Sequence, residues 1–216
     1  MERRLEPEVM DDPAQALAYA RADFEASNQA FADRCLAALR GVERGVVVDL
    51  GCGPADIPRR LVRALPPGVR VVGVDASRAM LALGRQAVGD ERRIDLVRAY
   101  LPDLPLRPGA CAIVSNSLLH HLPDPAPFWR AVAALGRPGA PVVVGDLFRP
   151  ASEAEARRIV DEAAVSDDPL LERDFYASLL AAFTPDEVQA QVRAAGLDLD
   201  VAVVSERHLV VQGRLA

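Results

Sequence analysis

Short apolar runs rich in β-branched residues alternate along the middle of the chain with stretches of helical pattern. Four of these runs are almost continuously apolar, namely 46–50, 71–75, 111–116 and 141–147. Strands that are buried on both faces show this pattern, so the runs predict a parallel sheet. The helical stretches between them predict right-handed crossovers that cover both faces of the sheet. The expected fold is therefore an α/β three-layer sandwich.

Two later runs, 199–204 and 208–213, are separated by a single short turn. They predict an antiparallel hairpin at one end of the sheet. Helix start signals agree with this alternation of strands and helices. Ser77 is a suitable N-cap for the stretch that follows it, and Thr184 with Glu187 predicts a capping box at the head of the last helix.

The whole chain of 216 residues is expected to fold as one domain. Its core spans residues 41–150, and a final helix and hairpin span 184–216. Two segments stand outside the alternation: an amphipathic N-terminal cap of one or two helices over 11–40, and a helical insertion over 152–183 that is broken near 166–169. Additions of this kind cover the mouth of an α/β sheet, where ligands bind, so both segments are predicted to form a lid.

The chain carries a formal net charge of -6, from 31 acidic and 25 basic side chains. Because phosphate backbones favour basic surfaces, this balance argues against nucleic acid as a partner and favours a small or cationic ligand. No apolar run approaches the roughly 18 residues that a membrane helix needs, so no membrane partner is expected. The pattern contains no feature that fixes an oligomeric state.

The three cysteines, Cys35, Cys52 and Cys111, are far apart. Their odd number and wide spacing fit neither a disulfide framework nor a zinc site. The first residues turn acidic where a secretory signal would need an apolar stretch. These observations predict a reduced, cytoplasmic protein.

The sharpest local pattern is VVVDLGCGPAD at 46–56, a buried strand that leads through an acidic residue into a glycine-rich turn. Gly51 and Gly53 allow tight backbone conformations and close approach of a ligand. Asp56 stands where a dinucleotide fingerprint has its third glycine, and it would repel a pyrophosphate. Asp75 ends the next strand, where a carboxylate can accept hydrogen bonds from a ribose diol. This combination favours a nucleoside that carries an amino acid moiety and a sulfonium in place of phosphate.

On these motifs the chain resembles the class I S-adenosylmethionine-dependent methyltransferases over roughly residues 40–215. Asp49 matches the acidic position of the family's first motif, and the loop Gly51, Cys52 and Gly53 would hold the methionine part of the cofactor. Asp75, with Ala76 beside it, matches the residue that binds the ribose. The resemblance implies a mostly parallel, seven-stranded sheet with its last strand antiparallel, including a weak strand near 94–98.

The stretch AYLPDLPL resembles the adenine-side motif, but Tyr100 stands where the family usually has aspartate, so backbone groups near Tyr100 and Leu101 are expected to bind adenine. The stretch AIVSNSLLHHLPDP resembles the fourth-strand motif of small-molecule members. It places Ser115 at the cofactor and offers Asn116 and His120 as the candidate catalytic residues, with His120 near the transferred methyl group.

Several other side chains are substrate candidates, with core packing or surface pairing as the alternative: Tyr19, Phe24, Asp146, Arg149 and Tyr176. The aromatic members would also stabilise a sulfonium by cation–π attraction. The pair His120 and His121 raises the question of a metal. Because adjacent side chains diverge and no acidic or cysteine partner stands at ligand spacing, no metal is expected.

The function that these patterns favour is transfer of a methyl group from S-adenosylmethionine to a small-molecule acceptor. One alternative is a protein of the same fold that binds S-adenosylmethionine or a nucleoside without catalysis. A nucleotide-dependent oxidoreductase is disfavoured by Asp56 and by the lack of a recognisable Tyr/Lys pair. Transfer of a different group from the sulfonium stays open, as does the choice among oxygen, nitrogen, sulfur and carbon acceptors.

Overall fold

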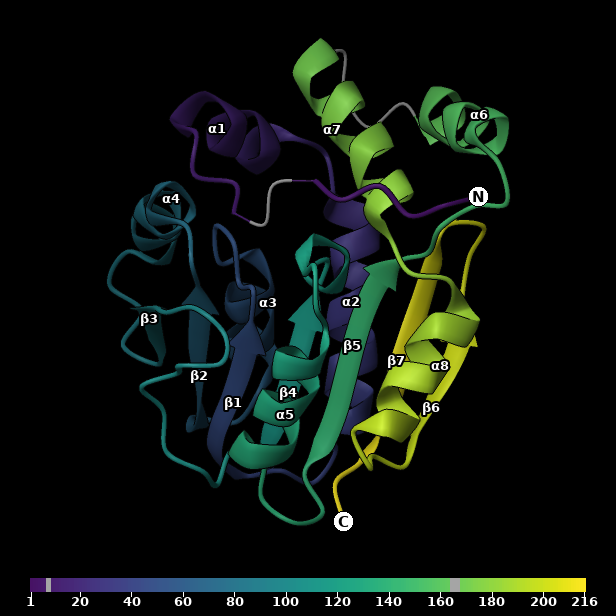
Figure 1. Ribbon diagram of the computed structural model, residues 1–216. Coiled ribbons are helices and arrows are strands. Elements are labelled where there is room, and N and C mark those ends of the chain that lie inside the picture. Colours follow the sequence, from purple (N-terminus) through teal and green to yellow (C-terminus); the bar gives the residue numbers. More distant parts are fainter. Residues whose placement is uncertain (7–8, 164–167) are drawn as a thin grey trace.

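The computed structural model describes residues 1–6, 9–163 and 168–216, and seven strands of this part of the chain form one sheet (Figure 1). The strands are β1 (Arg44–Leu50), β2 (Gly68–Asp75), β3 (Ile94–Arg98), β4 (Ala112–Asn116), β5 (Pro141–Leu147), β6 (Leu199–Val203) and β7 (His208–Arg214). Their order is β3-β2-β1-β4-β5-β7-β6. All neighbours pair in parallel except β7, which is antiparallel to β5 and to β6. The predicted sheet is confirmed, including its weak strand near 94–98.

Eight α-helices and one short 3-10 turn accompany the sheet in the described residues. They are α1 (Pro13–Arg21), α2 (Glu25–Ala38), α3 (Asp56–Ala64), α4 (Arg78–Val88), η1 (Leu119–His121), α5 (Ala126–Leu135), α6 (Glu153–Ala163), α7 (Pro169–Ala181) and α8 (Pro185–Ala194). Two of the predicted helix starts are confirmed in detail. The Ser77 hydroxyl accepts a hydrogen bond from the Met80 backbone, and Thr184 and Glu187 form a complete capping box.

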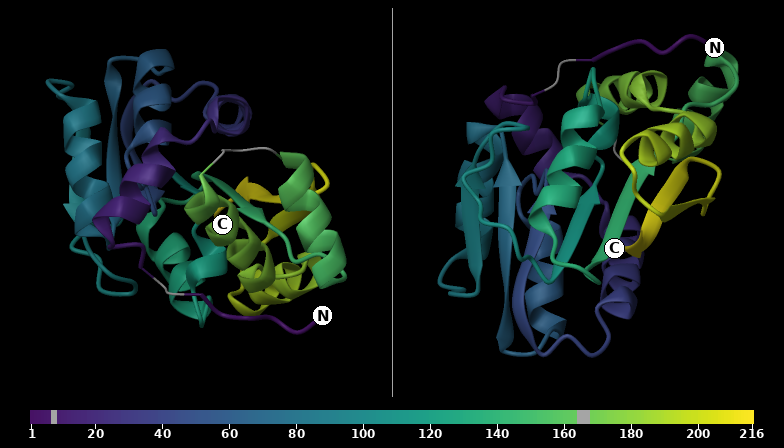
Figure 2. Two further views of the ribbon diagram at one scale, coloured as in Figure 1. Left: turned by 90° about the horizontal axis from the view of Figure 1, so that it is seen from above. Right: turned by 60° about the horizontal axis from the view of Figure 1, so that its bottom comes forward.

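Alternate side chains of the strands belong to two separate hydrophobic cores. Helices cover both faces of the sheet, so the molecule is a three-layer sandwich (Figures 1 and 2). Val47 of β1 packs with α2 and α3 on one face, whereas its neighbour Val48 packs with α5 and α8 on the other. Trp129 of α5 and Leu61 of α3 are fully buried anchors of these two layers. Successive strand residues point to opposite faces of the sheet, so the position of a residue along its strand decides which of the two cores it joins.

The predicted N-terminal cap over 11–40 is only partly correct. It forms two helices, but α2 lies against the sheet, where Phe31, Cys35 and Leu39 are buried in the core. Only α1 lies over the carboxyl ends of the strands, between α4 and α7 (Figure 2). The amphipathic pattern of this segment predicted two buried helical faces correctly but could not tell which surface each face covers.

The predicted insertion forms α6 and α7 above the carboxyl end of β5 (Figure 1). Of the predicted break at 166–169, residues 166 and 167 lie outside the described residues. The two helices share a small apolar core in which Ile159 and Leu179 are fully buried. No helix among the described residues combines the length and the apolar character that crossing a membrane requires.

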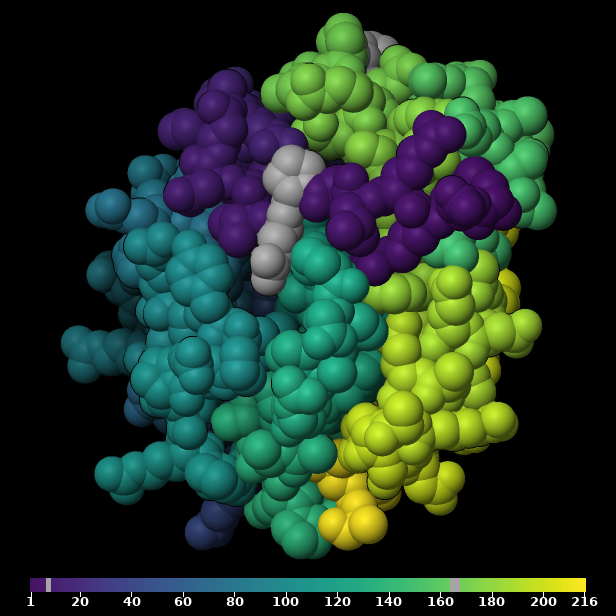
Figure 3. All heavy atoms as spheres, viewed as in Figure 1, coloured from purple at the N-terminus to yellow at the C-terminus, as the bar shows by residue number. Residues whose placement is uncertain are grey.

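The first six residues run over the same end of the molecule, on its outer surface (Figure 3). The Arg3 guanidinium donates to the carbonyls of His120, Leu122 and Ala181 at 2.9, 2.8 and 2.5 Å, and it lies 3.7 Å from the centre of the Phe183 ring. The chain is thereby attached to η1 and α7 before it enters α1.

Candidate active site

A cavity of about 640 Å³ lies at the carboxyl ends of the central strands, beneath α1 and α7. A second cavity of about 550 Å³ adjoins it beside the glycine-rich loop. The two share the residues Tyr19, Asp23, Phe24, Asn28, Gly51, Gly53 and Asn116. Each volume is within the range of small-ligand sites, and together they provide room for a cofactor and an acceptor side by side. This edge of an open α/β sheet is the expected ligand side.

The loop after β1 forms the floor of both cavities. Gly51 and Gly53 have φ angles of 74° and 51°, in the left-handed region that side chains disfavour. The amides of Gly51 and Cys52 both donate to the Val74 carbonyl, at 2.8 and 3.0 Å, which ties the loop to β2. A Cβ atom on Gly51 would lie 2.8 Å from the Cβ of Leu118. The backbone therefore comes close to the cavity only because this position has no side chain.

Two carboxylates lie under this loop. Asp49 is 1% exposed, and neither of its oxygens has a hydrogen-bond partner among the described residues. Burial, and secondarily the negative charge of Asp75, raise the pKa of Asp49 well above its ordinary value. An unpaired buried carboxyl is costly unless a ligand satisfies it. The group that would do so best is a cation or an N–H donor, which is what the methionine end of S-adenosylmethionine carries.

Asp75 lies at the end of β2, where its two oxygens accept hydrogen bonds from the amides of Gly53 and Ser77, both at 2.8 Å. Burial raises the pKa of Asp75, although these N–H groups oppose the shift. A carboxylate has about four acceptor positions, so capacity remains for a ribose hydroxyl. The same side chain thus shapes the glycine loop and faces the cavity.

Tyr100 and Leu101, which the sequence predicted on the adenine side, line the larger cavity together with Ala76, the neighbour of Asp75. Tyr100 is 49% exposed, and the Arg98 guanidinium donates to its hydroxyl at 3.0 Å. Leu104, which the sequence patterns did not single out, lines the wall beside them. The wall is apolar and suits a flat heterocycle.

Asn116, His120 and Asp146 meet at the other end of the larger cavity. The Asn116 amide donates to the Asn28 side chain at 3.4 Å, which links β4 to α2. His120 Nδ1 lies 2.5 Å from one oxygen of Asp146, and the His120 backbone amide donates to the other at 3.1 Å. Burial opposes the charged imidazole, but the Asp146 carboxylate outweighs it and raises the pKa of His120. The ring orientation of His120 is therefore fixed by Asp146.

Three predicted site residues line neither cavity. Ser115 is fully buried and donates to the Leu50 carbonyl at 2.7 Å, because alternate residues of β4 point to opposite faces. Arg149 pairs with Glu187 at 2.7 Å and holds α8 in place. Tyr176 lies under the Arg157 guanidinium at 4.2 Å, on the outer side of α7.

Tyr19 and Phe24 do line the cavity and contact each other, with ring centres 5.0 Å apart. Burial raises the pKa of Tyr19 to about 12, so its hydroxyl is protonated and available as a donor at neutral pH. The sequence patterns did not single out four further lining residues: Asn28, Arg34, Leu118 and Arg207. Leu118 could have been found, because it stands between the predicted Asn116 and His120. The others come from a helix and a hairpin whose approach to the site has no local sequence signal.

Residues 47–139 match a family model that is described as a methyltransferase domain. Over this range the chain is similar to a methyltransferase domain. The matched range contains the glycine loop, Asp75 and the β4 motif with Asn116 and His120. The residues that match the family model therefore include residues that line the cavity.

Solved structures of methyltransferases share the fold. A SAM-dependent methyltransferase from Aquifex aeolicus superimposes with a TM-score of 0.70 at 16% identity, covering 95% of this chain and 99% of that one. Human N-acetylserotonin methyltransferase, solved in complex with SAM, gives a TM-score of 0.64 at 16% identity and covers 95% and 57%. At these identities the likeness shows the fold alone.

Curated relatives match over shorter stretches. Trans-aconitate 2-methyltransferase of Klebsiella pneumoniae is 35% identical over 140 residues, which are 62% of this chain and 53% of that protein. A Mycobacterium tuberculosis protein of the same name is 39% identical over 85 residues, or 39% and 30% of the two chains. The chain thus spans about half or less of the length of these relatives.

Proposed function

We propose that this chain binds S-adenosylmethionine and transfers its methyl group to a small-molecule acceptor. The observation that carries the proposal is the unpaired, buried Asp49 beneath a glycine loop that Asp75 braces from the next strand. Asp49 and Asp75 are together suited to a ligand that carries a positive charge and hydroxyl groups. A pyrophosphate would meet repulsion at this position, which weighs against the oxidoreductase alternative.

The residues fit the cofactor along its length. Asp49 and the loop Gly51–Gly53 would hold the methionine part, Asp75 the ribose, and the apolar wall at Tyr100 the adenine. S-adenosylmethionine supplies a methyl group on a positively charged sulfur, which is already activated for transfer. The chain therefore has to align the two reactants and exclude water, and this alignment contributes up to roughly 7–11 kcal/mol.

Asn116 and His120 are the proposed catalytic residues because Asn116 lines both cavities and His120 lines the larger one. The Asn116 amide would orient the acceptor, and His120, fixed by Asp146, would contact the acceptor atom. We infer that α1, α7 and the first six residues form the lid. The cavity size favours a small acceptor over nucleic acid. The names of the relatives make small carboxylic acids the first class to test.

We also infer a reducing, cytoplasmic compartment. Cys35, Cys52 and Cys111 are all free and buried. Burial raises the pKa of each thiol, so none of them has the character of a reactive or disulfide-forming cysteine.

The proposed function is tested by calorimetric titration of the protein with S-adenosylhomocysteine, with NAD as control. Micromolar binding of S-adenosylhomocysteine and no binding of NAD are expected. Release of S-adenosylhomocysteine from S-adenosylmethionine in the presence of small carboxylic acids then measures turnover. Binding without turnover for any acceptor would favour the non-catalytic alternative, and absence of binding would overturn the proposal.

Gly51→Ala is expected to weaken S-adenosylhomocysteine binding by at least about tenfold. The added Cβ meets Leu118 at 2.8 Å and requires a left-handed backbone, so the loop must move into the space of the ligand. Gly89→Ala, at a helix end that has open space around it, is the matched control, because its φ angle of 55° is also positive and it lines neither cavity. Equal affinity of the two variants would show that the loop tolerates a side chain.

A further inference from the structure

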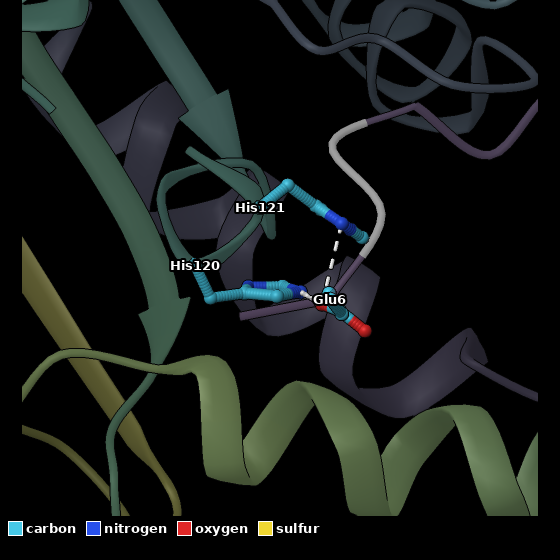
Figure 4. A group of neighbouring side chains, drawn as sticks. All are labelled: Glu6, His120 and His121. Atoms are coloured by element: carbon cyan, nitrogen blue, oxygen red, sulfur yellow. Dashed lines mark ion pairs between the residues drawn. The ribbon is translucent and has the colours of Figure 1, made fainter. Parts of the chain in front are cut away.

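Three potential metal ligands from distant parts of the sequence meet at the edge of the larger cavity (Figure 4). Glu6 belongs to the N-terminal segment, whereas His120 and His121 belong to η1. One oxygen of Glu6 lies 3.2 Å from His121 Nδ1 and 3.5 Å from His120 Nε2. The three ligand atoms all lie within 4.8 Å of one another. The sequence-based expectation that no acidic partner is near the histidines is therefore wrong.

These separations suit a shared ion. Divalent transition metals bind imidazole nitrogen and carboxylate oxygen at about 2.0–2.2 Å, which places neighbouring ligand atoms roughly 3.0–3.5 Å apart. Both contacts of Glu6 fall in this range. Although the two histidines are adjacent, their backbones turn through η1, and the rings converge with centres 4.2 Å apart.

The surroundings of His120 match those of a metal-binding histidine. Its Nδ1 lies 2.5 Å from Asp146, so a proton on Nδ1 is shared with that carboxylate and Nε2 is left to present its lone pair toward Glu6. A histidine that ligates a metal characteristically gives its other ring nitrogen to a carboxylate in this way.

Glu6 is held at this place by contacts other than the histidines. Arg3 attaches the segment to three backbone carbonyls, and the Ser178 hydroxyl lies 3.2 Å from the Glu6 carboxylate. The Glu6 side chain is 10% exposed, so little water is available to satisfy its charge. Burial accordingly raises the pKa of Glu6. A bound cation would replace the solvation that this carboxylate has lost.

We propose that Glu6, His120 and His121 bind one Zn²⁺ ion, or a divalent metal with the same preference for nitrogen and oxygen, at the acceptor end of the cavity. Two imidazoles and one carboxylate leave coordination positions open. His120 and His121 line the cavity, so the open positions face it. An oxygen of the acceptor is the group that would occupy one of them, and His120 would then act on the acceptor through the ion instead of contacting it directly. Only this last step rests on the proposed methyl transfer, since metal binding itself does not need it.

The test is calorimetric titration of the chelator-treated full chain with ZnCl₂ and, in parallel, MgCl₂. Zn²⁺ is expected to bind at about one ion per chain, and Mg²⁺, which prefers oxygen ligands, is not. Glu6→Gln and His121→Asn should each weaken Zn²⁺ binding by at least about tenfold. Glu2→Gln, at an exposed carboxylate of the same segment, is the matched control and should leave it unchanged. Thermal melts verify that every variant is folded.

Failure of Zn²⁺ to bind, or equal binding by all variants, would overturn the metal site and leave an ion-pair cluster in its place. Titration of the same samples with S-adenosylhomocysteine separates this result from failure of the proposed function. Zn²⁺ binding without S-adenosylhomocysteine binding would contradict the methyltransferase proposal and preserve the metal site. Substitution of Co²⁺ gives an independent readout, because its visible absorption changes when Glu6 or His121 is replaced.

Discussion

Asp75→Ala is expected to weaken binding of S-adenosylhomocysteine by about a hundredfold, which corresponds to about 2.7 kcal/mol. In the proposed complex the Asp75 carboxylate would accept hydrogen bonds from the ribose, and it also holds the Gly53 and Ser77 amides at 2.8 Å. The variant loses the ligand contact and the brace of the glycine loop together. Calorimetric titration of the wild type and the variant under the same conditions measures the effect.

Asp95→Ala provides the matched control for Asp75→Ala. Asp95 lies on the neighbouring strand β3, and its exposed carboxylate pairs only with Arg70 among the described residues. Exposed pairs of this kind contribute about 0–1 kcal/mol, so affinity and fold should both be retained. An Asp75→Ala protein that melts like the wild type and binds equally well would show that the ribose is held elsewhere.

Asp49→Asn is expected to stabilise the ligand-free protein at about pH 8 by about 2 kcal/mol while weakening cofactor binding by at least about tenfold. Burial raises the pKa of Asp49 in the folded state, so at intermediate pH the folded protein keeps a proton that the unfolded chain has lost. Stability contributed by this group is therefore lost as pH rises from the ordinary carboxyl pKa, 3.8, through the raised folded value. Because asparagine does not ionise, the Asp49→Asn protein does not lose this stability as pH rises.

Urea unfolding at about pH 4 and pH 8 measures the stability change for Asp49→Asn. The variant and the wild type should have similar stability at the lower pH, where both side chains are neutral, and should separate at the higher pH. A variant that is less stable at both values would show that the Asp49 carboxylate is hydrogen-bonded in the ligand-free protein. The trade of stability for affinity is typical of a residue kept for binding.

The fold could be predicted almost completely because its information is local. Buried parallel strands need continuous apolar runs, and all of the predicted strands, including 94–98, are present. The same holds for Asp49, Gly51 and Asp75, whose place at strand ends follows from their position in a short motif. Such residues depend on one strand and the turn after it, and not on how distant segments pack.

The rest of the site depends on contacts between distant segments. Ser115 and Asn116 both end the same strand, and only the pairing of the strand decides which of them reaches the cavity. Tyr176 and Phe175 are neighbours on α7, and Phe175 lines the cavity because of the way the helix is rotated. Glu6 meets His120 across more than a hundred intervening residues, and no feature of its own sequence neighbourhood indicates this contact.

The position of β7 has a consequence for the newly made chain. This strand is the last to be synthesised, yet it lies between β5 and β6 in the sheet. Every residue of β5 is buried in the folded protein, and among the described residues its outer edge pairs only with 208–214. While the ribosome is still making the segment between these strands, β5 has an apolar surface and a row of unpaired amides and carbonyls. The nascent chain is most prone to aggregation in that interval. The interval ends only when β7 pairs with β5 and β6.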